Sequence, residues 1–161
     1  MMESVLGVIG EAQIKTGMLK SQTWVLVVTD RRLLGARITD DLMKRVALAA
    51  RAQARASGSG FLGQWGAQVK SGFAMASRYL TMPPEAILAE TPGNWALWPG
   101  QVSSIRVEHV SEGGDDTASV DYLRITIGTS SGKGVYSTKS DNPSRQQVQA
   151  LLWRIFGPIV K

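Results

Sequence analysis

The chain has 161 residues, a formal net charge of +5 and 43% hydrophobic residues, and it contains no cysteine. This length favours a single domain with a buried core, so we expect one domain over residues 1–161. The absence of cysteine excludes disulfides, thiolate nucleophiles and thiolate metal sites.

We expect neither secretion nor a membrane span. The first residues, MMESVLGVIGEAQ, have no early lysine or arginine and contain a short apolar stretch broken by glycine, unlike a secretory signal peptide. No apolar run approaches the roughly 18 residues of a membrane-spanning helix. The expected location is therefore cytoplasmic, with peripheral association at the inner face of the membrane as the alternative.

The first part of the chain predicts strands. Residues Gly7–Ser21 are typical of a strand and a loop, with a turn-like cluster at Lys15-Thr16-Gly17. In Trp24–Ile38, two apolar runs flank the polar residues Thr29–Arg32, as in two strands joined by a tight turn. Because apolar residues are consecutive in both runs, we expect both faces of these strands to be covered, at least in part.

Residues 40–82 predict a helical hairpin. The stretch DDLMKRVALAARAQARASG is rich in alanine and arginine, which are strong helix formers, and Thr39 or Asp40 can cap it. After a Gly-Ser-Gly break, apolar residues recur at steps of three and four over residues 61–80, which predicts a second helix. A Met-Pro-Pro sequence ends this element.

The remainder predicts four more strands and a closing helix. Trp95–Trp98 is a short strand, whereas Val102–Val110 and Tyr122–Ile127 alternate between apolar and polar residues. A glycine-rich turn leads to a returning strand at Val135–Thr138.

The predicted closing helix covers residues 142–157. Asn142 is the expected cap, Pro143 suits the first helical position, and Gly157 with Pro158 stops the helix. Its apolar residues form one stripe, as expected for a helix packed on a sheet.

The order of these segments and their amino-acid sequences resemble those of bacterial PH-like domains of the GRAM and bacterial-PH group. TWVLVVTDRRLLGARI resembles their second and third strands, with a Thr-Asp-x-Arg turn between apolar strands. ALWPGQVSSIRVEHV, DYLRITIGTSSGKGVYSTKS and DNPSRQQVQALLWRIFG look like their later strands, hairpin and closing helix. The resemblance implies an α+β fold, namely a small antiparallel β-barrel of about seven strands with a C-terminal helix. Residues 40–82 are then an insertion, because a minimal PH-like domain has only a turn there.

Sequence patterns for catalysis or cofactor binding are weak, and we expect no enzyme, no cofactor and no metal. His109 is the one histidine, and we interpret it as structural. The acidic loop around Glu112, Asp115, Asp116 and Asp121 does not match the calcium-loop template. The glycine-rich stretch 128–134 is too short for a phosphate loop and leads into a strand rather than a helix.

The positive charge is concentrated in one segment. Residues 41–80 hold six basic residues and one acidic residue, whereas the rest of the chain is balanced, which favours a partner surface there. The candidate surface for a partner or membrane comprises Lys44, Arg45, Arg51, Arg55, Phe61, Trp65, Lys70, Phe73 and Arg78. A weaker candidate is a basic turn of Lys15, Lys20, Arg31 and Arg32, for which a solvated turn with local pairing to Asp30 is the competing interpretation.

Two functions follow as hypotheses from this surface. The first is a non-enzymatic interaction module that binds a protein partner or itself, because small and apolar residues in the hairpin suit close contact. The second is peripheral binding to anionic membrane lipid through the basic hairpin. Ordinary packing of the hairpin onto the barrel remains a third explanation for its apolar residues. Nucleic acid is disfavoured, because no basic strand face accompanies the aromatic residues.

Overall fold

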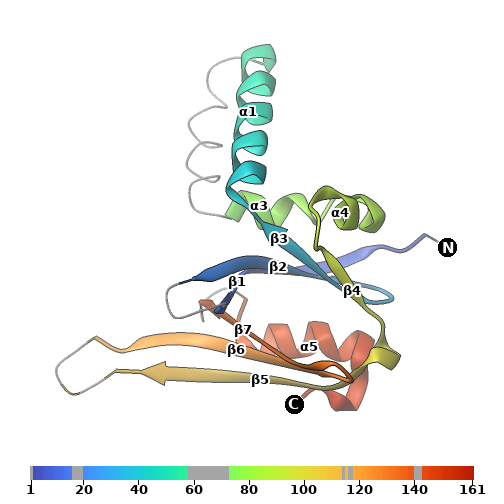
Figure 1. Cartoon of the computed structure of the whole chain (residues 1–161), viewed down its shortest axis with the longest axis vertical. Helices are drawn as coiled ribbons and strands as arrows, with labels where there is room; N and C mark the ends of the chain where they lie inside the picture. The colour runs from blue at the N-terminus through green and yellow to red at the C-terminus, as the bar shows by residue number, and fades with distance from the viewer. Residues whose placement is uncertain (1, 16–19, 58–72, 114, 116–117, 140–142) are drawn as a thin grey trace.

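The computed structural model describes residues 2–15, 20–57, 73–113, 115, 118–139 and 143–161. These residues form an α+β fold built on a seven-stranded antiparallel sheet with the order β4-β3-β2-β1-β7-β6-β5 (Figure 1). The strands are β1 Val5–Lys15, β2 Ser21–Thr29, β3 Leu33–Ile38, β4 Trp95–Leu97, β5 Val102–Glu112, β6 Val120–Thr129 and β7 Gly132–Lys139. The helices are α1 Asp40–Ser57, α3 Phe73–Arg78, α4 Pro84–Glu90 and α5 Arg145–Phe156, with short 3-10 turns at Pro99–Gln101 and Gly157–Ile159.

The main core lies between the sheet and α5. Alternate residues of β2, including Trp24, Leu26 and Val28, face Val148 and Leu152 of α5 in one buried cluster. The intervening residues of β2, Val25 and Val27, are also fully buried, in a second cluster under α3 and α4. The prediction that both faces of this hairpin are covered is therefore confirmed, which explains its continuous apolar runs.

The closing helix is confirmed with a different start. Ser144, rather than Asn142, caps α5, and its side chain accepts a hydrogen bond from the Gln147 amide while Gln147 binds back to the Ser144 amide. Asn142 lies outside the described residues, and Pro143 precedes the cap instead of opening the helix. Gly157 ends the helix with φ +65°, a conformation that favours glycine.

The helix predicted for the first half of residues 40–82 is observed. Helix α1 begins after Thr39, whose hydroxyl accepts a hydrogen bond from the Leu42 amide at 3.1 Å, so Thr39 is the cap. Of the second predicted helix, residues 61–72 lie outside the described residues, and α3 covers its end. Helix α4 is not predicted from the sequence, because Pro83 and Pro84 indicate a break; Pro84 instead opens the helix, where its missing amide hydrogen costs nothing.

Candidate interaction surface

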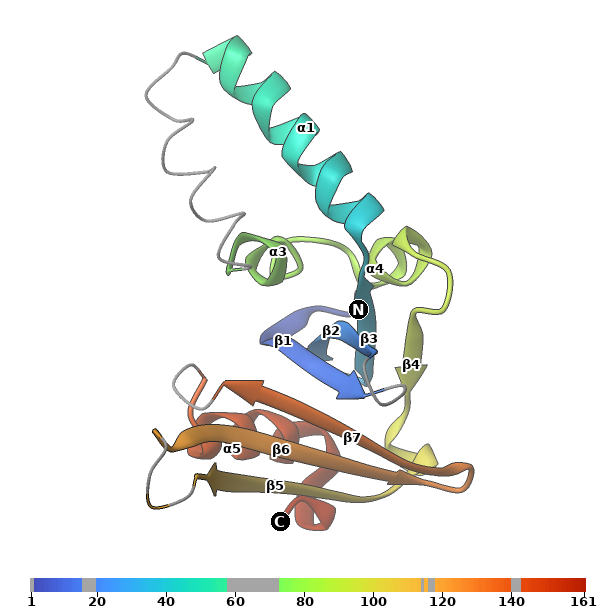
Figure 2. The same cartoon turned by 60° about the vertical axis from the view of Figure 1, so that its left-hand side comes forward.

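Helix α1 leaves the sheet at the end of β3 and extends away from it (Figures 1 and 2). Its first two turns are anchored, because Leu42 and Val46 are buried against Met75 of α3 and touch Ile38. Among the side chains that the structure describes further along α1, none is buried. Within the described residues, the helix is therefore packed at its base, and beyond the base it has no buried side chain.

The outward face of α1 carries a row of cations. Lys44, Leu48, Arg51 and Arg55 follow one another at steps of four, three and four residues, so they share one face of the helix. The three basic residues are exposed, and Leu48 is 62% exposed in the middle of the row. We refer to these four residues as the basic stripe. It presents long cationic side chains around one apolar side chain.

The remaining candidates of the helical segment are distributed differently. Arg45 lines a groove beside the stripe, between α1 and the pair Arg78–Glu90. Arg78 is not part of the stripe, because its guanidinium binds both carboxylate oxygens of Glu90 at 2.9 and 3.1 Å. Phe61, Trp65 and Lys70 lie outside the described residues, and so does the side chain of Phe73 at the start of α3.

The four residues of the predicted basic turn do not form one site. Lys15 and Lys20 lie at the end of the sheet where α1 begins, because Lys15 pairs with Ser21 and Thr23 pairs with Ile38. Arg31 and Arg32 lie at the other end of β2. A strand of nine residues separates the two pairs by about 30 Å at roughly 3.3 Å per residue.

Arg32 is buried rather than solvated, which corrects that interpretation of the turn. Its side chain is 9% exposed, donates to both oxygens of Glu3, contacts Glu85 at 2.6 Å and lies 4.9 Å from the centre of the Trp98 ring. The hydrogen bond with Glu3 raises the pKa of Arg32. Asp30 accepts a hydrogen bond from the Ser4 amide. Arg32 therefore links the N-terminal segment, the turn and α4, whereas Arg31 is exposed.

The pKa of Glu3 reflects the same contacts. Burial alone would raise the pKa of this carboxyl, but hydrogen bonds from Arg32 and Thr29 and the charge of Arg32 outweigh burial and hold it below its ordinary value. The Glu3–Arg32 pair is thus a charged structural link.

A second charged patch lies at the far end of the β5–β6 hairpin. Glu112, Asp115 and Asp121 are exposed there, and the hairpin end lies on the far side of the sheet from α1 (Figures 1 and 2). We refer to these three residues as the acidic end. His109, predicted to be structural, lies on β5 and is exposed. Within the described ranges, no three histidine, cysteine or acidic residues are grouped as metal ligands would be.

The comparisons with known proteins identify no relative. No family model matches the chain, and no curated protein or solved structure matches it either. Among the helices that the structure describes, none combines the length and apolar character needed to cross a bilayer. What the protein binds is therefore inferred from its own exposed residues.

Proposed function

We propose that this protein is a PH-like interaction module without catalytic activity, and that its basic stripe binds an acidic surface of a protein partner. The order of the elements supports the PH-like assignment: seven antiparallel strands are followed by one C-terminal helix that packs on the sheet. The helices between β3 and β4 are then an insertion, and α1 is its projecting part.

The observation that carries the proposal is the exposed basic stripe on a helix whose described side chains are buried only in its first two turns. Helix α1 has 18 residues, a length of about 27 Å at roughly 1.5 Å per residue. Isolated helices are marginally stable without packing, so such a helix gains stability from a covering surface. Arg51 and Arg55 are also like charges four residues apart, an arrangement that costs about 0.2–0.5 kcal/mol and that an acidic partner would relieve.

A protein partner fits the stripe better than a membrane does. Basic residues near an anionic bilayer contribute about 1 kcal/mol each, so three of them alone give an affinity weaker than about 1 mM. A membrane-surface helix adds a broad apolar face, whereas Leu48 is the one large apolar residue on the stripe. Arginine side chains, by contrast, bind carboxylates in a paired geometry that strengthens each contact.

A second copy of the chain is the first partner to consider. Two basic stripes placed face to face would repel each other, but the acidic end offers three exposed carboxylates of opposite sign. Because α1 and the acidic end lie on different sides of the sheet, pairing between them would join copies head to tail. This arrangement makes self-association dependent on both patches.

The test compares two variants with the same change in net charge. Arg51→Glu with Arg55→Glu reverses the stripe, whereas Arg31→Glu with Arg154→Glu reverses two exposed cations elsewhere. Light scattering at low and high salt measures self-association, and fluorescence anisotropy measures binding of labelled poly-L-glutamate. We expect the wild type and the control to bind poly-L-glutamate at low salt, and the stripe variant to lose most of this binding.

Two outcomes would contradict the proposal. If the two variants bind poly-L-glutamate and self-associate equally well, the stripe does not take part in the interaction. Salt-sensitive sedimentation with phosphatidylglycerol vesicles, without binding of poly-L-glutamate and with a monomeric wild type, would favour the membrane function instead.

A further inference from the structure

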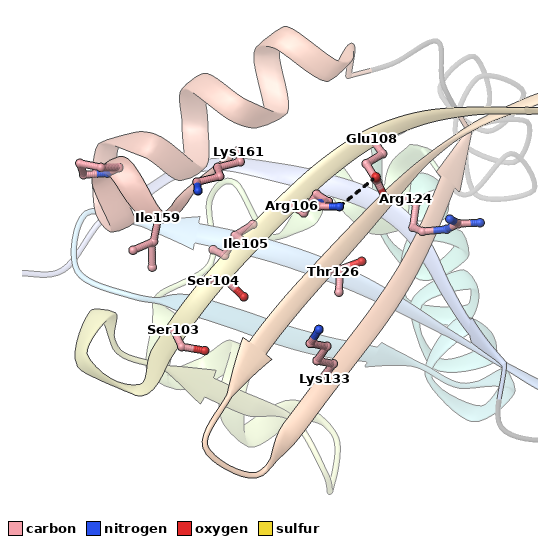
Figure 3. A pocket seen from close by; sticks show the side chains of 11 residues that line it. Ser103, Ser104, Ile105, Arg106, Glu108, Arg124, Thr126, Lys133, Ile159 and Lys161 are labelled. Atoms are coloured by element: carbon pink, nitrogen blue, oxygen red, sulfur yellow. Dashed lines mark ion pairs between the residues drawn. The ribbon is translucent and has the colours of Figure 1, made fainter.

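A polar groove lies on the outer face of the β5–β6–β7 part of the sheet, turned away from the core. It has a volume of about 570 Å³, which is within the range of small-molecule sites. Its floor is formed by hydroxyl-bearing and basic side chains of the three strands, and Pro158 and Ile159 form an apolar wall on one side. Figure 3 shows the side chains that line it.

Two serine hydroxyls come together in this groove because of a glycine and a register shift. The pairing of β5 with β6 shifts between Val102 and Ser104, and Ser104 lies opposite Gly128. A side chain on Gly128 would place its Cβ 2.6 Å from the Ser104 Oγ and 3.2 Å from the Ser103 Oγ. The bare backbone of Gly128 therefore leaves room for both hydroxyls.

Cations border the same hydroxyls. Lys133 lies opposite Gly128 on β7 and Arg106 lies opposite Thr126, and Figure 3 shows the ammonium of Lys133 extending over the strand toward Thr126. Arg106 approaches Glu108 at 3.6 Å, but both side chains are more than one-third exposed, so this pair is weak. The guanidinium of Arg124 points away from the groove.

Four of the polar side chains in the groove have no partner among the described residues. Among the residues that the structure describes, no side-chain hydrogen bond or ion pair engages Ser103, Ser104, Thr126 or Lys133. Three hydroxyls and one ammonium can all donate hydrogen bonds. The lining also includes one carboxylate, that of Glu108, which lies 3.6 Å from the guanidinium of Arg106.

We propose that this groove binds the phosphate group of a small phosphate monoester. A phosphate dianion offers three strong acceptor oxygens and about two negative charges near neutral pH, which matches the donors of Ser103, Ser104 and Lys133 and the nearby charge of Arg106. The groove is larger than a phosphate group, so the organic part of the ligand lies along Ile159. This site is on a different face from the basic stripe and does not depend on it.

The experiment is a titration of ¹⁵N-labelled protein with inorganic phosphate, glycerol 3-phosphate and sulfate, followed by NMR. We expect chemical-shift changes at residues 103–106, 126–128 and 133, tighter binding of glycerol 3-phosphate than of phosphate, and weaker binding below a pH of about 6, where phosphate loses its second charge. Lys133→Gln and the pair Ser103→Ala with Ser104→Ala should each weaken binding about tenfold. Gly128→Ala should act similarly by displacing the Ser104 hydroxyl, and Arg154→Gln on α5 is the unaffected control.

The outcomes separate this proposal from its alternatives. Vesicles with phosphatidic acid test whether the phosphate belongs to a lipid, and shifts at the groove with these vesicles but not with glycerol 3-phosphate would assign the site to a headgroup. Equal, pH-independent binding of sulfate and phosphate would show a non-specific anion site and overturn the proposal. Unchanged affinity in Lys133→Gln, with the fold intact by circular dichroism, would overturn it as well.

Discussion

The guanidinium of Arg32 binds the carboxylate of Glu3 through two hydrogen bonds of 2.9 Å, and both side chains are nearly buried. The same guanidinium also reaches Glu85 at the start of α4. Arg32 therefore joins the N-terminal segment and helix α4 to the turn between β2 and β3. Removal of one buried partner leaves the other charge without compensation.

Loss of the Glu3 charge should destabilise the fold. We expect Glu3→Gln to lower the free energy of unfolding by about 2–3 kcal/mol, because Arg32 then keeps only a partner whose side chain is 82% exposed. The matched variant Glu85→Gln should cost less than about 1 kcal/mol, since an exposed ion pair contributes little. Urea unfolding of the three proteins measures both values, and equal losses would contradict the assignment.

The same pair predicts how stability depends on pH. The pKa of Glu3 is lower in the folded protein than its ordinary value of 4.5, so its ionised form stabilises the fold above about that pH. This contribution decreases as the pH falls below 4.5 toward the folded-state pKa. The stability difference between wild type and Glu3→Gln should therefore narrow in acid. A difference that stays constant between neutral and acidic pH would count against the charged pair.

Gly35 should not tolerate even one added methyl group. It pairs with Trp95 across β3 and β4, and a Cβ there would overlap the indole ring of Trp95. Trp95 in turn lies 6.1 Å from the ring centres of both Trp24 and Tyr136. We expect Gly35→Ala to cost about 1–3 kcal/mol and to change the near-ultraviolet circular dichroism of these aromatic residues.

The control for this substitution is Gly100→Ala. A Cβ at Gly100 would meet no atom within 4 Å, so its stability and near-ultraviolet spectrum should match the wild type. If Gly35→Ala has the same stability and near-ultraviolet spectrum as Gly100→Ala, Trp95 does not pack closely on Gly35 of β3.

Substitution of two leucines of α1 by alanine should change the stability of the helix by very different amounts. Leu42 is 2% exposed and belongs to the cluster with Met75, so Leu42→Ala should weaken the anchoring of α1 by about 2–4 kcal/mol. Leu48 is 62% exposed, and Leu48→Ala should change helix stability by less than about 0.5 kcal/mol. Amide hydrogen exchange of residues 40–57 measures both effects. Faster exchange in Leu48→Ala but not in Leu42→Ala would show that Leu48, and not Leu42, lies on the packed face of α1.

Local sequence patterns predicted most of the strands and the two longest helices. The continuous apolar runs of β2 and β3 indicated strands covered on both sides, and two buried clusters are found there. The alanine-rich composition of α1 and the apolar stripe of α5 were sufficient to predict both helices, because these signals lie within a few turns.

Features that depend on distant residues were not predictable in the same way. Arg32 was expected in an exposed turn, either as part of a weaker candidate basic site or as a solvated residue. Its burial depends on Glu3 and Glu85, which lie 29 and 53 residues away. The two lysines and two arginines of the predicted basic turn are separated because β2 runs between them. Sequence spacing does not reveal this distance until the strand pairing is known.

The polar groove was missed for a related reason. Gly128 and Lys133 were considered as parts of a phosphate loop and rejected, because the segment leads into a strand, and β7 does begin there. Their relation to Ser103 and Ser104 arises from the pairing of β5, β6 and β7. A serine pair opposite a glycine carries no sequence signal of its own.

The most direct test of the proposed function is a mixture of two charge-reversed proteins. One carries Arg51→Glu and Arg55→Glu in the basic stripe, and the other carries Asp115→Lys and Asp121→Lys in the acidic end. If the stripe of one copy binds the acidic end of another, light scattering at low salt should show monomers for each variant alone and association when they are mixed. A mixture that remains monomeric under conditions where the wild type associates would contradict this account.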